Sequence, residues 1–198
     1  DVRLSRGLGD VYKRQVSRLL EWLWNGAWRR AITRGSMLGS RIPDAKGSLD
    51  FVGLNYYTHF ITGLFLPTST EELSFAKREN EVGTEFGYPM YAEGMRRAID
   101  FVSELEVPIE ITENGVADSD DSLRPVHLMR HLWVISEAIK DGRDVISYHH
   151  WSLMDNFEWA EGYKMRFGLY HVDFETQERT LRPSGEIYRD IINSSSKM

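Results

Sequence analysis

Polar and aromatic side chains with sugar-binding chemistry follow three short apolar segments of this chain, 49–54, 107–112 and 145–151. The residues that could act there are Asn55, Tyr56, Tyr57, Glu113, Asn114, Trp151, Asp155, Asn156, Glu158 and Trp159. Carboxylates and amides pair with vicinal hydroxyls, and an indole stacks on the apolar C–H face of a sugar ring. The set therefore favours a neutral polyhydroxylated ligand.

A purely structural role for each of these residues stays open, because a strand-end glutamate is often an ion-pair partner and a tryptophan often fills a core. A phosphorylated ligand is disfavoured, since the chain has no glycine-rich phosphate loop and no Lys or Arg cluster beside these positions. His149 and His150 are adjacent in an expected strand and would point to opposite faces, so they cannot easily chelate one ion. We expect no metal and no cofactor.

The composition describes a soluble globular protein. The 198 residues include 24 Lys and Arg against 30 Asp and Glu, a net charge of −6, with 41% hydrophobic and 27% charged residues. The acidic balance argues against a nucleic-acid partner, and no window approaches the run of about 18 apolar residues that a membrane helix needs. With no cysteine, disulfides and thiolate nucleophiles are excluded.

Hydrophobic periodicity predicts alternating helices and buried strands. The expected helices cover 16–34, 91–105, 123–140 and 184–192, and the expected buried strands cover 49–54, 107–112 and 145–151. A weaker strand is expected at 60–66, a long loop at 68–89, and a hairpin from 167–174 and 179–181. This alternation indicates parallel βα units, in which ligands bind at the carboxyl ends of the strands.

Three parallel strands cannot close a barrel, and a (β/α)₈ barrel takes about 250 residues. The chain is therefore either a small open sheet or part of a barrel. Residues 1–15 lack a clear period, do not begin with Met and lead into no apolar signal segment. We expect them to be non-native sequence or a disordered arm, with one domain over 16–198 and a cytoplasmic location.

Four groups of residues resemble glycoside hydrolase family 1, the β-glucosidases and β-glycosidases. Ile111–Gly115 (ITENG) is similar to the family's nucleophile motif, and Trp151–Trp159 (WSLMDNFEW) to its sugar-binding motif. Asp50–Tyr57 (DFVGLNYY) resembles the sixth barrel strand, and three short C-terminal stretches, RFGL, VDF and RPS, resemble the family's final signature. The resemblance implies the C-terminal part of a (β/α)₈ TIM barrel, about three of its eight strands plus a β-hairpin, incomplete as given.

The resemblance implies a retaining mechanism on β-D-glucosyl or galactosyl residues. Glu113 would attack the anomeric carbon, and Tyr57 would hydrogen-bond its carboxylate and help to keep it charged. The partner would be a small-molecule β-glycoside or oligosaccharide. The choice between glucosides and galactosides stays open.

The resemblance also implies which residues bind the sugar. Glu158 would take the hydroxyls on C4 and C6, and Trp159 the hydroxyl on C3. Trp151 would form the stacking platform, with Phe167 and Asn55 in the same pocket. Segment 68–89, including Gly87–Pro89, would lie on the aglycone side.

One part of the family's machinery has no match in these residues. Retention needs a second carboxyl group about 5–5.5 Å from the nucleophile, and the family's Asn-Glu-Pro sequence that supplies it does not occur here. Glu110 has the opposite strand parity to Glu113 and should face away, and nothing assigns the acid role to Asp155 or Glu161. We expect the isolated chain to be inactive and to self-associate through exposed barrel edges. The alternative is a non-catalytic carbohydrate-binding protein.

Overall fold

The computed structural model describes residues 18–19, 22–37, 39–59 and 80–195. The first part contains η1 (Trp22–Gly26), α2 (Ala27–Arg34), β1 (Ser36–Met37), β2 (Ser40–Arg41), η2 (Pro43–Ala45) and β3 (Val52–Asn55). The middle contains α3 (Ala92–Ser103), β4 (Ile109–Asn114), α4 (Arg124–Lys140) and β5 (Val145–His150). The last part contains η3 (Trp159–Glu161), β6 (Tyr170–Val172), β7 (Arg179–Leu181) and α5 (Pro183–Ser195).

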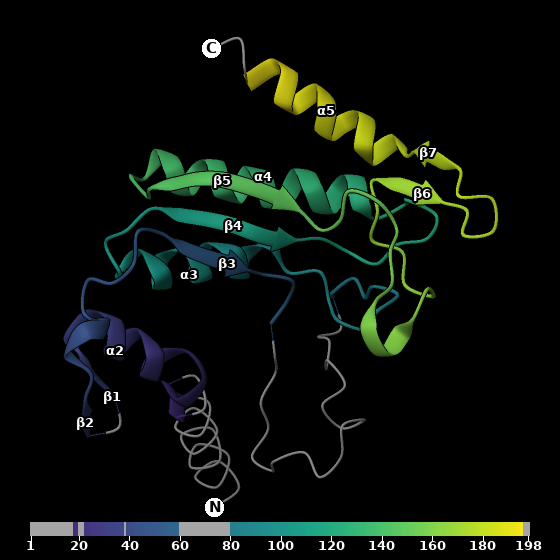
Figure 1. Ribbon diagram of the computed structural model, residues 1–198. Helices are drawn as coiled ribbons and strands as arrows, with labels where there is room; N and C mark the ends of the chain where they lie inside the picture. The colour runs from purple at the N-terminus through teal and green to yellow at the C-terminus, as the bar shows by residue number, and fades with distance from the viewer. Residues whose placement is uncertain (1–17, 20–21, 38, 60–79, 196–198) are drawn as a thin grey trace, which may run out of the picture.

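The main sheet has three parallel strands in the order β3-β4-β5. Val52 lies opposite Ile109, and Ile109 lies opposite Val145. All three strands end on the same side of the molecule, next to the antiparallel hairpin of β6 and β7 (Figure 1). The prediction of parallel βα units is confirmed, and the strands of the described residues form no closed barrel.

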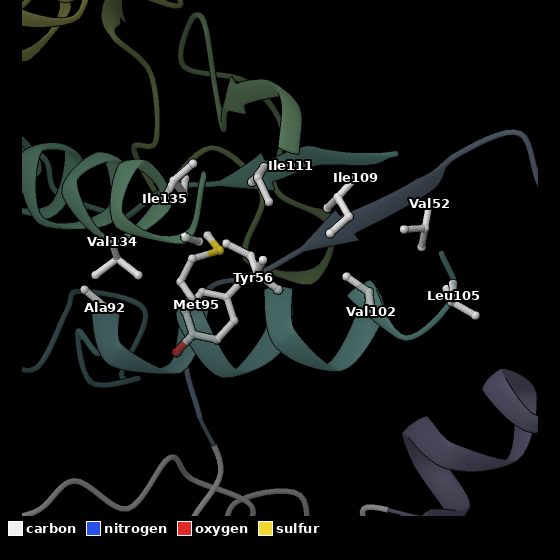
Figure 2. Packing of buried hydrophobic residues seen from close by; sticks show 12 residues of the cluster. Val52, Tyr56, Ala92, Met95, Val102, Leu105, Ile109, Ile111, Val134 and Ile135 are labelled. Carbon is white, nitrogen blue, oxygen red and sulfur yellow. The ribbon is translucent and has the colours of Figure 1, made fainter. Parts of the chain in front are cut away.

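One face of the sheet is covered by α3 and α4 through a continuous apolar core. Ile109 and Ile111 of β4 meet Met95 and Ile99 of α3, and all four are at most 1% exposed. Figure 2 shows Ile109 and Ile111 directed toward the α3 side, with Tyr56 lying against Met95. Tyr56 reaches this layer because Gly94 has no side chain: a Cβ there would lie 2.0 Å from the Tyr56 hydroxyl.

The expected helix over 16–34 differs from the structure at Trp22–Gly26, which forms a π-helical turn. Residues 18–19 and Ala27–Arg34 are α-helical, and residues 16–17 and 20–21 lie outside the described part of the chain. Asn25 and Gly26 are both poor helix formers, which weakens a regular α-helix at this point. The helix ends where expected, after residue 34, because Gly35 closes it with φ at 61°.

The expected hairpin over 167–174 is shorter in the structure. Only Tyr170–Val172 pairs with β7, because the backbone of Phe167 and Leu169 bonds to Ser152 instead. The Ser152 amide donates to Phe167 at 3.1 Å, and the Leu169 amide donates to Ser152 at 2.9 Å. Segment 151–159 is thereby attached to the hairpin.

Several expectations lie outside the described residues: the arm at 1–15, the strand at 60–66 and most of the loop at 68–89. In the part of the chain that the structure describes, no helix has the length and apolar character needed to cross a membrane.

Candidate active site

The expected nucleophile and its hydrogen-bond partner meet where β3 and β4 end. The Tyr57 hydroxyl donates to Oε2 of Glu113 at 2.7 Å. The backbone holds this pair together, because the Tyr56 amide donates to the Glu113 carbonyl at 2.9 Å. Burial, and then the hydrogen bond to Glu113, raise the pKa of Tyr57, so its hydroxyl remains a donor. The phenol therefore orients one carboxylate oxygen of Glu113.

The expected sugar platform is bonded to the expected hydroxyl acceptor. The Trp151 indole Nε1 donates to Oε1 of Glu158 at 2.9 Å, and the Trp151 amide donates to the Asn114 carbonyl at 2.9 Å. These two bonds fix the indole to the end of β4 and to the following loop. Gly115 is required here, since a Cβ at that position would lie 1.7 Å from the Trp151 carbonyl oxygen.

A tight turn presents Trp159 to solvent. The Glu158 amide donates to the Gly162 carbonyl at 2.7 Å, which closes the turn around η3. Trp159 is 85% exposed and has a φ of 40°, a left-handed conformation that side chains other than glycine seldom adopt. Such strain concentrates at functional sites. An exposed indole in this geometry is suited to contact a ligand.

Phe167 lies in a small second core beneath the site. It is 4% exposed and packs with Ala117 and Met165, while Tyr57, Phe86 and Trp151 close the cluster from the site side. The Phe167 ring meets Tyr57 edge-on, with centroids 6.2 Å apart. Phe167 therefore supports the residues that line the site.

Asn55 lies at the end of β3, where its side-chain oxygen accepts a hydrogen bond of 2.6 Å from the Thr112 hydroxyl. The register of β3 against β4 shifts between Leu54 and Asn55, so that Asn55 pairs with Glu113. This irregularity interrupts the strict alternation along β4. Strand parity therefore does not by itself separate Glu110 from Glu113.

Two of the candidate sugar ligands point elsewhere. Asn114 is fully buried, and its side chain bonds to the neighbouring strand ends. Asp155 is 3% exposed and accepts two hydrogen bonds from Arg182, at 3.0 and 3.1 Å, and two from the amides of Gly168 and Val172. Burial alone would raise the pKa of Asp155, but these donors lower it overall. Both residues are structural supports of the site.

The acidic turn at 118–121 serves the same supporting purpose. Asp118 accepts from the amides of Leu123 and Arg124 at 2.9 and 2.8 Å, which caps the start of α4. Asp121 pairs with the buried Arg124 and accepts from the amide and hydroxyl of Ser184 at the start of α5. The turn therefore joins α4 to α5.

Sequence reasoning placed Tyr88 in a segment expected on the aglycone side but did not identify it as a support of Tyr57. It is 4% exposed, and its ring lies 6.2 Å from Tyr57 and 5.4 Å from Phe86. The segment that carries it is bonded to β3's continuation, since the Thr58 hydroxyl donates to the Pro89 carbonyl at 2.7 Å. The aromatic pair Phe86 and Tyr88, separated by a single glycine, was the available signal.

Among the described residues, no group of three or more His, Cys, Asp or Glu side chains has the geometry of a metal site. A carboxylate held by a phenol, next to an indole held by a second carboxylate, can instead bind a sugar and attack it covalently.

The family model for glycosyl hydrolase family 1 matches residues 29–197. The chain belongs to glycosyl hydrolase family 1. A β-galactosidase from Saccharolobus solfataricus is 35% identical over 184 residues, covering 88% of this chain and 37% of the relative. A 1,4-β-D-glucan glucohydrolase from Thermotoga neapolitana is 39% identical over 166 residues, covering 78% of this chain and 37% of the relative.

Solved structures of family 1 enzymes share the fold. A β-glycosidase from Pyrococcus horikoshii superposes with a TM-score of 0.77 at 36% identity, over 90% of this chain and 43% of that one. The β-glucosidase from Thermotoga maritima in complex with noeuromycin gives 0.80 at 29% identity, over 90% and 46%. The chain thus spans less than half the length of these family 1 proteins, and its three-stranded sheet is part of a TIM barrel.

Proposed function

We propose that this chain carries the nucleophile and the sugar-binding wall of a retaining β-glycosidase. The hydrogen bond of 2.7 Å from Tyr57 to Glu113 carries the proposal, because it orients a carboxylate at the carboxyl ends of barrel strands. Family membership supports the same reaction class.

Glu113 performs nucleophilic substitution at the anomeric carbon. One carboxylate oxygen forms a bond to that carbon, while the bond to the aglycone oxygen breaks and its electron pair leaves with that oxygen. A general acid donates the proton that the leaving oxygen needs. Water then attacks the same carbon, gives its proton to the general base, and releases Glu113 as a carboxylate.

The sugar is neutral and is held by Glu158, Trp159 and Trp151. Glu158 keeps one carboxylate oxygen on the Trp151 indole and offers the other to hydroxyls. A carboxylate there would repel a phosphorylated sugar. The Thermotoga maritima β-glucosidase has been solved with galacto-hydroximolactam and with castanospermine, which supports a small sugar-like ligand. β-Glucosides and β-galactosides are the substrates we propose, since relatives are named for both.

We propose that these 198 residues alone do not turn over ordinary glycosides. No Asn-Glu-Pro sequence occurs in them to supply the general acid, and losing a general acid costs about 10²–10⁴ in rate. A substrate whose leaving group needs no proton avoids that requirement.

The test is covalent trapping with a dinitrophenyl 2-deoxy-2-fluoro-β-glucoside, read by intact and peptide mass spectrometry. The chain should gain one fluoroglucosyl group on Glu113 and should not hydrolyse an unactivated alkyl glucoside. Glu113→Gln should take no label, while Glu110→Gln, the same change on the same strand, should be labelled at the parent rate. Sugar binding without any label on Glu113 would favour the carbohydrate-binding alternative.

A further inference from the structure

Asn114 follows the nucleophile directly but takes no part in the open site. Its side chain is fully buried beneath the strand ends. Three hydrogen bonds fill its polar groups: Nδ2 donates to the Tyr56 carbonyl at 2.7 Å, Oδ1 accepts from the Tyr148 hydroxyl at 3.0 Å, and the main-chain carbonyl accepts from the Trp151 amide at 2.9 Å. One residue therefore joins the ends of β3, β4 and β5.

These bonds complete a ring that contains the nucleophile. The Tyr56 carbonyl held by Asn114 belongs to the peptide that leads into Tyr57, and the Tyr57 hydroxyl holds Glu113 at 2.7 Å. Glu113 in turn is covalently joined to Asn114. The position of the Tyr57 phenol relative to the Glu113 carboxylate thus depends on the orientation of the Asn114 amide.

Tyr148 holds the other end of that amide. The Tyr56 carbonyl can only accept, so it selects the Nδ2 end, and Oδ1 at the opposite end then needs a donor. The Tyr148 hydroxyl is this donor, and burial together with Tyr188 raises the pKa of Tyr148, so it stays protonated. The other polar side-chain atom near it, Nδ1 of His150, is farther away at 3.5 Å.

We propose that Tyr148 is a positioning residue that acts through Asn114 to hold the Tyr57–Glu113 pair in its reactive geometry. The inference rests on the proposed function, since it needs Glu113 to be a nucleophile. Without the hydroxyl, Oδ1 of Asn114 becomes a buried acceptor without its donor, which is unfavourable. The amide then turns or shifts, and Tyr57 moves with the Tyr56 carbonyl.

The chain offers a matched control. Tyr188 lies against Tyr148, with ring centroids 6.0 Å apart, and its hydroxyl donates to the Tyr148 carbonyl at 3.2 Å. Tyr188→Phe and Tyr148→Phe each remove one hydroxyl from the same neighbourhood. Only Tyr148→Phe removes the bond to Asn114.

The experiment measures how fast the same fluoroglucoside labels Glu113 in the full chain, at a series of fluoroglucoside concentrations. Two quantities are obtained: the maximal first-order labelling rate, and the fluoroglucoside concentration that gives half of that rate. Small displacements of reacting groups cost up to about a hundredfold in rate, so Tyr148→Phe should lower the labelling rate by about tenfold or more. The half-saturating concentration should change less than about twofold, because the sugar contacts are intact. Tyr188→Phe should match the parent in both.

Each outcome has a separate meaning. A parent chain that takes no label on Glu113 overturns the proposed function and this inference together. A labelled parent with an unchanged rate in Tyr148→Phe overturns the inference alone. Equal rate losses in both variants, or a rise in the half-saturating concentration at an unchanged rate, also overturn it, because a merely structural role would produce them.

Discussion

The sheet and the segment that follows it, residues 151–184, are stabilised by different interactions. Between the sheet and its two helices the contacts are apolar, with Met95, Ile99 and Ile111 each completely buried. In the following segment a small apolar cluster with Met165 and Phe167 is joined by a buried ion pair, Asp155 with Arg182. The strands are thus held by apolar burial, whereas the site loops depend in addition on directed, charged hydrogen bonds.

This difference follows from what each region must do. A sheet covered by helices can bury one whole apolar face, which is favourable by about 25 cal/mol per Å². Under the proposed function, the segment presents Trp151, Glu158 and Trp159 to a sugar, so it must stay open on one side and has less apolar surface to bury. Charge-assisted bonds are shorter and more directional, so they can hold a loop in one geometry with little apolar burial.

The largest expected effect on stability comes from removing the buried ion pair between Asp155 and Arg182. Asp155→Asn should lower the free energy of unfolding by about 3–5 kcal/mol, because it leaves Arg182 buried without its charge partner. Urea unfolding followed by tryptophan fluorescence measures the loss. Asp190→Asn removes the same charge from an exposed pair with Arg189 and should cost less than about 1 kcal/mol. Similar losses in both variants would contradict the comparison.

An intermediate effect is expected at low pH, from the buried His131 of α4. Burial lowers the pKa of His131 from 6.5 to about 4, with a smaller opposing effect from its bond to the His127 carbonyl. His127 stacks on it at 3.9 Å, Tyr56 lies 6.1 Å away, and the charges of Arg130 and Glu93 partly offset each other.

Because its folded pKa lies below its unfolded value, His131 contributes stability that is fully present above about pH 6.5 and is lost as the pH falls toward 4. His131→Phe should therefore reduce the loss of stability between pH 7 and pH 5 by about 2 kcal/mol. Urea titrations at the two pH values measure it. The same titrations on His149→Gln, which replaces an exposed histidine, are the control for a histidine substitution outside the core.

The smallest effect on stability is expected from shortening one side chain in the apolar core between the sheet and its helices. Ile99→Val should lower the free energy of unfolding by about 0.5–1.5 kcal/mol, since it removes one methylene from a closed core. Ile192→Val makes the same change at an exposed position of α5, and surface changes of this kind stay within about 0.5 kcal/mol. Thermal unfolding of the two variants compares their losses of stability. A larger loss in Ile192→Val than in Ile99→Val would show that the core is not tightly packed.

Local pattern was a good guide to the elements themselves. The helix expected over 123–140 is α4 at Arg124–Lys140, and the strand expected over 107–112 is β4 at Ile109–Asn114. Both segments have long apolar repeats, so each has only one way to bury its face. The helix expected over 16–34 is interrupted by the π-helical turn Trp22–Gly26, next to the poor helix former Gly26. The hairpin strand expected over 167–174 is limited to Tyr170–Val172, because Phe167 and Leu169 bond to Ser152.

The roles within the candidate site were harder to predict. The pairing of Tyr57 with Glu113 was expected from the family resemblance, and the structure forms it. Asn114 and Asp155 looked like sugar ligands by their types and positions, yet both are buried supports. Type and spacing place a polar residue at a strand end but leave open which way its side chain turns after a register shift.

By itself the sequence determined the parallel βα order, the family and the three strand ends that carry the candidate site residues. These features depend on local periodicity and short motifs. The tertiary structure alone decided that Asn114 turns inward, that Tyr148 reaches it, and that Glu158 bonds to the Trp151 indole. Such contacts depend on angles and register between segments far apart in the chain. A hydrogen bond is sensitive to fractions of an ångström, which residue spacing does not specify.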